Sequence, residues 1–380
     1  MATTESTAAR AHDTGTIATR LDAADFVHVL ARKDGDALAA TALVGRALDD
    51  RGVPNQVTFA DSPRNVTERT RTEGTVLGIG FESTDISLPS GTSLSRAAAN
   101  LVTSLDAERD PVLALAGALS VGASEQELLE AAESDGLAKS PGIGIPVEDL
   151  SVGLAYTGLF HAEFSGDKDA AASFLDDLGI PTAAEKTIND EDMQRLASAV
   201  SVAASDRPAP DRAVEALTDA IGPLVPGGPV RTVPGYADVI GALSRNDPSF
   251  GYRFLLGHET RSNAVERWKR HTGHVHDALH GGTIEAEGDL AVLTVERADP
   301  WSVARLGRDF CVKESAILVL EEETAANTPR TIALGSVDRD ARKWLETAVG
   351  PEAVTGRDDL ATGVLDAGES DLVKAIREGA

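Results

Sequence analysis

The sequence predicts an α/β protein with a parallel-sheet N-terminal domain and a smaller C-terminal α/β domain. Its 380 residues exceed what a single hydrophobic core usually holds, so two domains are expected. Between residues 25 and 123, short apolar strands alternate with amphipathic helices, a pattern typical of a parallel sheet covered on both faces. Further apolar strands between residues 288 and 337 indicate a second sheet.

The first domain is predicted from three strands and the helices that accompany them. The strands are DFVHVLAR (25–32), QVTFAD (56–61) and TVLGIGF (75–81). After the first strand, GDALAATALVGRALDDRG places apolar residues on one helical stripe and ends at a glycine. Two more helices are expected in SLSRAAANLVTSL and DPVLALAGALSVGA.

The rest of the chain is predicted to be mainly helical up to residue 252 and mixed after it. A long polar helix is expected over ETRSNAVERWKRHTGHVHDALH, followed by the strands GDLAVLTVE, SAILVLEEE and RTIALGSV. The segment IGPLVPGGPVRTVPG is rich in Pro and Gly, which predicts a linker or hinge. We therefore expect a disordered tail at 1–22, a first domain with a helical extension at 23–220, a connecting region at 221–252 and a second domain at 253–380.

The composition is strongly acidic. The chain has 35 Lys and Arg residues against 61 Asp and Glu residues, which gives a net charge of −26. Self-repulsion of this size strains a compact state, and molar salt relieves it because the Debye length falls to about 3 Å at 1 M. The composition therefore resembles that of a salt-adapted protein. Because counterion release contributes little to binding in molar salt, the acidity neither favours nor excludes nucleic acid as a partner.

The sequence carries no signal for a membrane or for secretion. No apolar run approaches the roughly 18 residues of a membrane span, and the Ser/Thr/Ala-rich N-terminal segment has no hydrophobic leader core. Cys311 is the only cysteine, which excludes an intrachain disulfide and a cysteine-based zinc site. We expect a cytoplasmic protein that does not contact a membrane.

The stretch ARKDGDALAATA (31–42) places two carboxylates between a strand and a helix. Asp34 and Asp36 follow the carboxyl end of the strand, where open parallel sheets bind their ligands, so they are candidate ligands of a divalent metal. The alternative is capping, in which these side chains accept hydrogen bonds from the free N–H groups of the helix that begins near Ala37. The two residues alone leave both interpretations open.

The order of several motifs resembles the DHH phosphoesterase superfamily, in particular its archaeal RecJ-like branch with a C-terminal DHHA1 domain. KDGDALAATAL is similar to the first motif of that superfamily, and DPVLALAGALSVG is similar to its fourth-motif helix. GLFHAEFSGDKDAAASFLDDLGIP and YADVIGALSR resemble the intervening region, and GDLAVLTVE, SAILVLEEE and RTIALGS resemble the strands of the second domain. The resemblance covers residues 24–368 and implies a parallel-sheet DHH domain followed by a DHHA1-like domain.

The resemblance also implies a centre of two metal ions, usually manganese, held by Asp and His residues of four motifs. Such chemistry needs two ions about 3.5–4 Å apart with several ligands each. This sequence keeps Asp34 and Asp36 but contains no Asp-His-His, and GALSVG lacks the Asp expected in the fourth motif. We expect two aspartates to be too few for two ions. Our hypothesis is that Arg32 or Lys33 neutralises them in place of metal.

In the second domain, VTGRDDLATG stands where the superfamily has a glycine-rich, His-containing loop. By this resemblance, Gly356, Arg357 and Gly363 are predicted to contact nucleic acid. Asp358 stands at the His position and would repel a phosphate.

The segment HTGHVHDALH holds four histidines in ten residues. On one straight helix His271 and His274 would face one way and His276 and His280 nearly the opposite way, so a single four-His metal site is not expected. His276 and His280 alone have the i, i+4 spacing of two metal ligands, and a solvated helix face is the interpretation that we favour. The neighbouring RWKR either contacts phosphate or covers one buried Trp.

These observations support three hypotheses about function. In the first, the chain is a RecJ-like protein with a degenerate metal site and no cofactor, and it interacts with single-stranded nucleic acid or, as inactive members of the superfamily do, with GINS-type replication proteins. In the second, it is a divergent Mn²⁺- or Mg²⁺-dependent single-strand exonuclease or phosphoesterase that recruits Glu82, Asp85 or His161 as ligands. In the third, it senses a small nucleotide. We favour the first, a non-catalytic role in DNA replication or repair.

Overall fold

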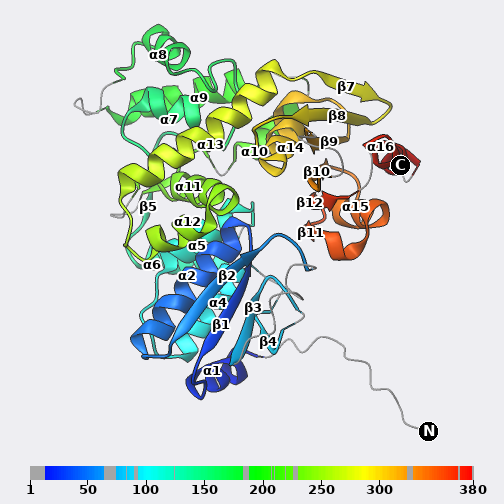
Figure 1. Ribbon diagram of the computed structural model, residues 1–380. Helices are drawn as coiled ribbons and strands as arrows, with labels where there is room; N and C mark the ends of the chain where they lie inside the picture. Colours follow the sequence, from blue (N-terminus) through cyan, green and yellow to red (C-terminus); the bar gives the residue numbers. More distant parts are fainter. Residues whose placement is uncertain are drawn as a thin grey trace. The chain divides into compact units, whose positions relative to one another are not determined.

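The computed structural model describes residues 13–63, 74–82, 84–89, 93–123, 125–182, 188–206, 208, 210–218, 220–225, 230–322, 328–366 and 369–378 (Figure 1). The chain forms two compact units. Unit 1 comprises Met1–Gly136 and Leu243–Thr260, and unit 2 comprises Leu137–Ala242 and Arg261–Ala380. The predicted boundaries do not follow this division, because α12 (Pro248–Leu255) returns to unit 1 and packs against its helix α2 (Gly35–Asp50).

Unit 1 contains a four-stranded parallel sheet in the order β2-β1-β3-β4. The strands are β1 (Val27–Arg32), β2 (Asn55–Ala60), β3 (Thr75–Ile79) and β4 (Ile86–Ser87). From β1 the chain passes to β2 on one side and then to β3 on the other, so the direction of strand order reverses between β1 and β3. We call the carboxyl ends of β1, β2 and β3, together with the residues that directly follow them, the carboxyl edge of unit 1.

Small residues allow the helices of unit 1 to pack closely around α2. The other helices are α1 (Thr14–Asp22), α4 (Leu94–Ser104), α5 (Pro111–Ser120), α6 (Gln126–Ser134) and α12. Helix α2 contacts α4, α5 and α12, and its alanine-rich sequence is buried over almost its whole length (Figure 1). The strands and helices predicted for residues 25–123 are confirmed.

Two features of the predicted ends and connections are corrected. The tail predicted for 1–22 is helical from residue 14, because Ile17 and Leu21 are fully buried and Asp13 caps the helix; residues 1–12 lie outside the described part. The connecting region predicted at 221–252 contains most of α11 (Val233–Asn246) and α12, although Pro and Gly are frequent before them. The boundaries of functional domains stay a prediction.

Unit 2 contains a six-stranded mixed sheet in the order β11-β12-β10-β9-β8-β7. The strands are β7 (Ile284–Glu287), β8 (Leu290–Val295), β9 (Ala316–Glu321), β10 (Arg330–Ser336), β11 (Val354–Gly356) and β12 (Leu360–Leu365). Strands β8 and β9 are parallel, and the other pairs are antiparallel. Alternate residues of β8, β9 and β10 belong to two different hydrophobic clusters, so both faces of the sheet are covered.

The helices of unit 2 form most of its remaining structure. They are α7 (Leu150–Tyr156), α8 (Lys168–Asp177), α9 (Asp190–Ser205), α10 (Pro210–Ala216), α11, α13 (Arg261–Gly281), α14 (Pro300–Leu306), the π-helix η1 (Gly307–Cys311), α15 (Ala341–Val349) and α16 (Glu369–Glu378). A 3₁₀ turn, η2 (Pro351–Ala353), precedes β11, and two short strands, β5 (Ala138–Lys139) and β6 (Leu224–Val225), pair separately. The predicted fold class, a parallel N-terminal sheet with a second α/β part, is confirmed.

The prediction that the histidines of α13 lie on a solvated helix face is wrong for His271 and His276. Helix α13 buries Ala264, Trp268, His271 and Val275, which recur at helical spacing along one stripe, and it also buries His276 on another side. His271 and His276 therefore do not belong to a solvated face, and the single Trp of RWKR is fully buried. Within the described residues, no helix is long and apolar enough to cross a membrane.

Candidate functional site

Asp34 is the N-cap of α2 and also forms an ion pair with Arg32. Its Oδ1 accepts a hydrogen bond from the Ala37 amide at 2.8 Å, and its Oδ2 accepts one from Arg32 Nε. Burial would raise the pKa of Asp34, but Arg32, the Ala37 amide and Arg245 outweigh it and hold that pKa below its ordinary value. Asp34 is therefore a charged carboxylate whose two oxygens already have protein donors.

Asp36 connects α2 to the start of α4. Its Oδ1 accepts hydrogen bonds from the Ser93 hydroxyl at 2.9 Å and the Ser95 amide at 2.8 Å, and its Oδ2 accepts one from the Leu94 amide at 2.7 Å. Burial and the neighbouring Asp34 raise the pKa of Asp36 despite these donors. Asp36 thus satisfies free N–H groups at the start of a helix that lies almost 60 residues further along the chain.

The two cations predicted to replace metal have different partners. Burial would lower the pKa of Arg32, but attraction to Asp34 and Asp36 outweighs it and raises that pKa. Lys33, which we also expected to neutralise the two aspartates, instead forms an ion pair with Asp61 at 2.7 Å. Successive residues of an extended chain point to opposite sides, which accounts for the separation of Arg32 from Lys33.

The aspartates do not fit a divalent metal centre. All four oxygens of Asp34 and Asp36 accept hydrogen bonds from N–H or O–H groups, so a cation would have to displace donors that the fold itself supplies. Among the residues that the structure describes, no group of three or more His, Cys, Asp or Glu side chains is placed to hold a metal ion.

The alternative ligands that we considered have other roles. Asp85 Oδ2 accepts a hydrogen bond from the Val76 amide at 3.0 Å, and Glu82 is exposed. His161 belongs to unit 2, where its Nδ1 lies 3.0 Å from Nδ1 of His276. Asp85 and His161 each have a structural partner of their own.

The predicted nucleic-acid contacts of unit 2 lie in a β-hairpin, with the two glycines in its strands and Arg357 in the turn between them. Gly356 ends β11, Gly363 lies inside β12, and the two strands pair directly. Arg357 donates from Nε and Nη2 to the Asp359 carboxylate at 3.0 and 2.9 Å, and Arg308 donates to the same carboxylate at 2.9 Å. Burial would raise the pKa of Asp359, but the two arginines outweigh it and lower that pKa. Contact of this hairpin with nucleic acid stays a prediction.

The sequence did not reveal a buried polar network around Asp238 of α11. Asp238 Oδ2 accepts hydrogen bonds from the Thr157 hydroxyl at 3.0 Å, the Gly158 amide at 2.9 Å and Trp268 Nε1 at 3.0 Å. Burial raises the pKa of Asp238 in spite of these donors. The only signal in the sequence is a single Asp in the apolar run YADVIGAL.

His276 lies beside this network. Its Nε2 donates to the Thr157 carbonyl at 2.9 Å, which leaves Nδ1 of His276 as the acceptor for Nδ1 of His161 at 3.0 Å. Burial lowers the pKa of His276 to about 4. The ring of His280 is tilted against that of His161, and its Nε2 lies 2.8 Å from the Ser165 carbonyl. These histidines therefore form internal hydrogen bonds.

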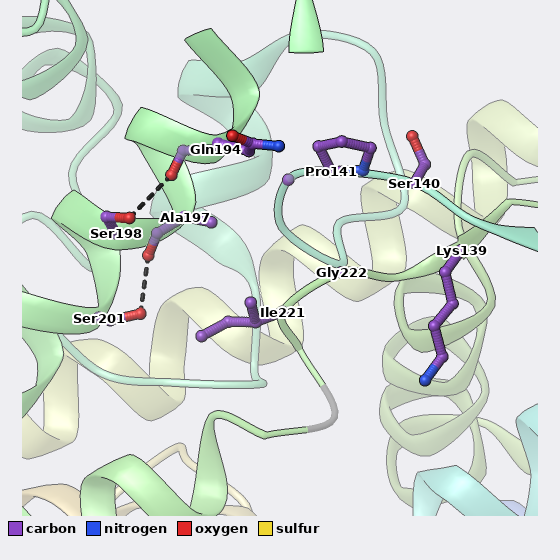
Figure 2. A pocket seen from close by; sticks show the side chains of 10 residues that line it. Lys139, Ser140, Pro141, Gln194, Ala197, Ser198, Ser201, Ile221 and Gly222 are labelled. Atoms are coloured by element: carbon purple, nitrogen blue, oxygen red, sulfur yellow. Dashed lines mark hydrogen bonds between the residues drawn. The ribbon is translucent and has the colours of Figure 1, made fainter. Parts of the chain in front are cut away.

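A hollow of about 620 Å³ lies between α9 and the segments around β5 and β6 of unit 2 (Figure 2). Small side chains of α9 line it, and the hydroxyls of Ser198 and Ser201 donate to the carbonyls of Gln194 and Ala197 in their own helix. Because these hydroxyls already donate within α9, the lining of the hollow does not indicate which ligand it could bind. None of the predicted site residues lies in this hollow.

Comparison with known proteins identifies the fold. A scan against protein-family models finds no match. The structure is similar to CDC45 from Entamoeba histolytica, with a TM-score of 0.57 and 11% identity over 93% of this chain and 95% of that chain. RecJ in complex with Mn²⁺ from Thermus thermophilus gives a TM-score of 0.49 and 13% identity over 97% of this chain and 54% of that chain.

The chain is thus an α/β protein whose fold is similar to that of CDC45 from Entamoeba histolytica. It is 35% identical over 374 residues to "Uncharacterized protein rrnAC1427" of Haloarcula marismortui, across 96% of each chain, and it belongs to the same family as that protein. A haloarchaeal relative agrees with the salt-adapted composition.

Proposed function

We propose that this chain is a non-catalytic, RecJ- and CDC45-like protein that interacts with single-stranded nucleic acid or with GINS-type proteins in DNA replication or repair. The observation that carries the proposal is that every oxygen of Asp34 and Asp36 accepts a hydrogen bond from a protein donor. In relatives that hydrolyse phosphodiesters, the resemblance implies that these positions hold metal.

The energetics support this proposal over hydrolysis. A cation bound to Asp36 would displace three donors at the start of α4, and each buried donor left unpaired costs about 1–3 kcal/mol. A cation at Asp34 would also meet the guanidinium of Arg32, which already pairs with that carboxylate. The unpaired donors and the repulsion by Arg32 both disfavour binding of a divalent ion at these residues.

The test combines a metal titration with a cleavage assay in molar KCl. Mn²⁺ is titrated calorimetrically into the full chain and into Asp36→Ala, and Mn²⁺-dependent cleavage of a short end-labelled single-stranded oligonucleotide is followed in parallel. Asp61→Ala is the matched control, because Asp61 is a half-exposed carboxylate that pairs with Lys33. We expect neither stoichiometric micromolar Mn²⁺ binding nor cleavage. Micromolar binding and cleavage that Asp36→Ala abolishes and Asp61→Ala preserves would establish the exonuclease hypothesis instead.

The binding half of the proposal has its own measurement. We expect the chain to shift the fluorescence anisotropy of a labelled single-stranded oligonucleotide, or to co-purify with GINS-type subunits from cells of a salt-adapted host. Absence of both would contradict an interaction role in replication or repair.

A further inference from the structure

Arg32 uses only part of its guanidinium within the protein. Its Nε donates to Asp34, and within the described residues it makes no other hydrogen bond, so Nη1 and Nη2 have no acceptor there. Its side chain is 23% exposed. By contrast Arg46, a structural arginine of the same unit, donates from Nη1 to Asp110 and from Nη2 to the Leu255 carbonyl. Arg32 therefore keeps hydrogen-bonding capacity that Arg46 has used.

Arg32 lies where open parallel sheets bind ligands. It is the last residue of β1, and the order of strands reverses between β1 and the adjacent β3. Ligands of open α/β sheets bind outside the carboxyl ends of the strands at this kind of reversal. Gly80 follows β3 with φ +82°, and a Cβ on it would lie 3.0 Å from Cβ of Arg32. Gly80 thus lets the end of β3 pass close to the stem of Arg32.

The charge around Arg32 is more favourable to an anion than the net charge of the chain suggests. Asp34 and Asp36 are 4% and 3% exposed, and their oxygens accept hydrogen bonds inside the unit. Lys33, on the same edge, has a side chain that is 32% exposed, and Arg245 is near enough to lower the pKa of Asp34. The two carboxylates that interact with Arg32 therefore face inward, and although Lys33 is paired with the half-exposed Asp61, the guanidinium of Arg32 stays partly accessible in a chain of net charge −26.

We propose that Arg32 binds a phosphate group directly at the carboxyl edge of unit 1, without a metal ion. The inference rests on the proposed function, since single-stranded nucleic acid is the source of phosphate to which it commits. With Nε held by Asp34, the two Nη groups can donate end-on to two phosphate oxygens, a paired geometry that lysine cannot supply. Short-range paired hydrogen bonds of this kind persist in molar salt, which screens longer-range attraction.

The test removes the guanidinium without changing net charge. The double variant Arg32→Gln/Asp34→Asn replaces the ion pair by two neutral amides, so no buried carboxylate is left unpaired. Arg253→Gln is the control for loss of a unit 1 arginine, since Arg253 is 50% exposed and pairs with Glu259. Arg32→Lys keeps a cation beside Asp34 but has a single ammonium group in place of the planar guanidinium. Thermal unfolding checks that each variant is folded.

The probes are a short 5′-phosphorylated oligothymidylate followed by anisotropy in molar KCl, and inorganic phosphate followed by ³¹P line broadening. We expect the double variant to bind the oligonucleotide about tenfold more weakly, which corresponds to about 1.4 kcal/mol. Arg32→Lys should be intermediate and Arg253→Gln unchanged. An unphosphorylated oligonucleotide that binds equally well would assign the contact to an internal phosphate and still support the inference.

The remaining outcomes separate this inference from the proposed function. Equal oligonucleotide affinity in all variants would overturn the role of Arg32 and leave an interaction with nucleic acid in place. Arg32-dependent broadening by inorganic phosphate without oligonucleotide binding would support the phosphate site and contradict the nucleic-acid role. Failure of the unmodified chain to bind either probe would overturn the phosphate site.

Discussion

The carboxyl edge of unit 1 and the Asp238 network of unit 2 accommodate a buried aspartate in different ways. Each holds a buried aspartate that accepts hydrogen bonds from protein donors. Asp34 has an arginine as direct partner and its pKa is lowered, whereas Asp238 accepts hydrogen bonds only from neutral donors and its pKa is raised. In unit 2 Asp238 thus serves as an acceptor inside the fold, whereas in unit 1 the ion pair of Asp34 holds a partly exposed guanidinium.

The same comparison explains why two signals for metal in the sequence have another meaning. Asp34 and Asp36 resemble half of a metal centre, and His276 and His280 have the spacing of two ligands. In each region the polar atoms bond to protein groups instead. In both regions, the residues that resemble metal ligands form hydrogen bonds within their own unit.

The largest expected effect is on the Asp238 network. Asp238→Ala leaves three buried donors without an acceptor, and at about 1–3 kcal/mol each we expect unit 2 to lose about 4 kcal/mol of its free energy of unfolding. Asp238→Asn keeps an acceptor oxygen and the volume, so it should lose less than half as much. Guanidinium unfolding followed by circular dichroism measures both. Equal losses in the two variants would show that the carboxylate is not the centre of the network.

His276 makes the stability of unit 2 depend on pH. Its folded pKa of about 4 lies below its ordinary value of 6.5, so between these values the unfolded chain binds more protons and stability falls as pH falls. Across the whole range from pH 6.5 to pH 4, this corresponds to a loss of about 3 kcal/mol in the free energy of unfolding. His276→Gln removes the titration and keeps a donor for the Thr157 carbonyl, so we expect a flatter dependence of unfolding free energy from pH 6.5 to 4.

His258→Gln is the control for this pH dependence, because His258 is an exposed histidine of unit 1. It should retain the dependence of the unmodified chain. A dependence that survives in His276→Gln would assign the acid sensitivity to another group.

Substitution of Arg32 tests how much its ion pair with Asp34 stabilises unit 1. Arg32→Gln leaves Asp34 buried without its cation, and because the Arg32 side chain is 23% exposed we expect a loss of about 2 kcal/mol, below the roughly 3–5 kcal/mol of a fully buried pair. The double variant with Asp34→Asn should recover more than half of this loss. Chemical unfolding of unit 1 measures the difference, and a double variant as unstable as the single one would mean that the charge of Asp34 is not what Arg32 stabilises.

How far the sequence predicts the fold depends on whether the signal is local. Strands β1, β8, β9 and β10 were predictable because they are almost continuously apolar and buried on both faces. Strands β7, β11 and β12 were missed because IEAE and VTG are short, and LATGVL contains residues of low strand preference. Their strand character comes from neighbours in the sheet that no local pattern encodes.

The candidate site divides in the same way. Capping by Asp34 could be predicted because its acceptor oxygen and the Ala37 amide are three residues apart. The donors of Asp36 lie 57 to 59 residues away, and the partners of His276 lie 115 and 119 residues away. These contacts are set by tertiary packing, so the sequence showed polar residues without showing what they bond to.

The smallest expected effect comes from the residue next to Arg32. Lys33 pairs with Asp61, but the two side chains are 32% and 50% exposed, and ion pairs with this exposure contribute about 0.5 kcal/mol or less. Lys33→Gln should therefore leave the unfolding free energy of unit 1 nearly unchanged in the same experiment that reports the loss in Arg32→Gln. Two neighbouring cations that pair with aspartates would then differ severalfold in effect because only one partner is buried. A loss in Lys33→Gln equal to that in Arg32→Gln would instead mean that the two cations act as one coupled network, and that the burial of Asp34 does not set the strength of its ion pair.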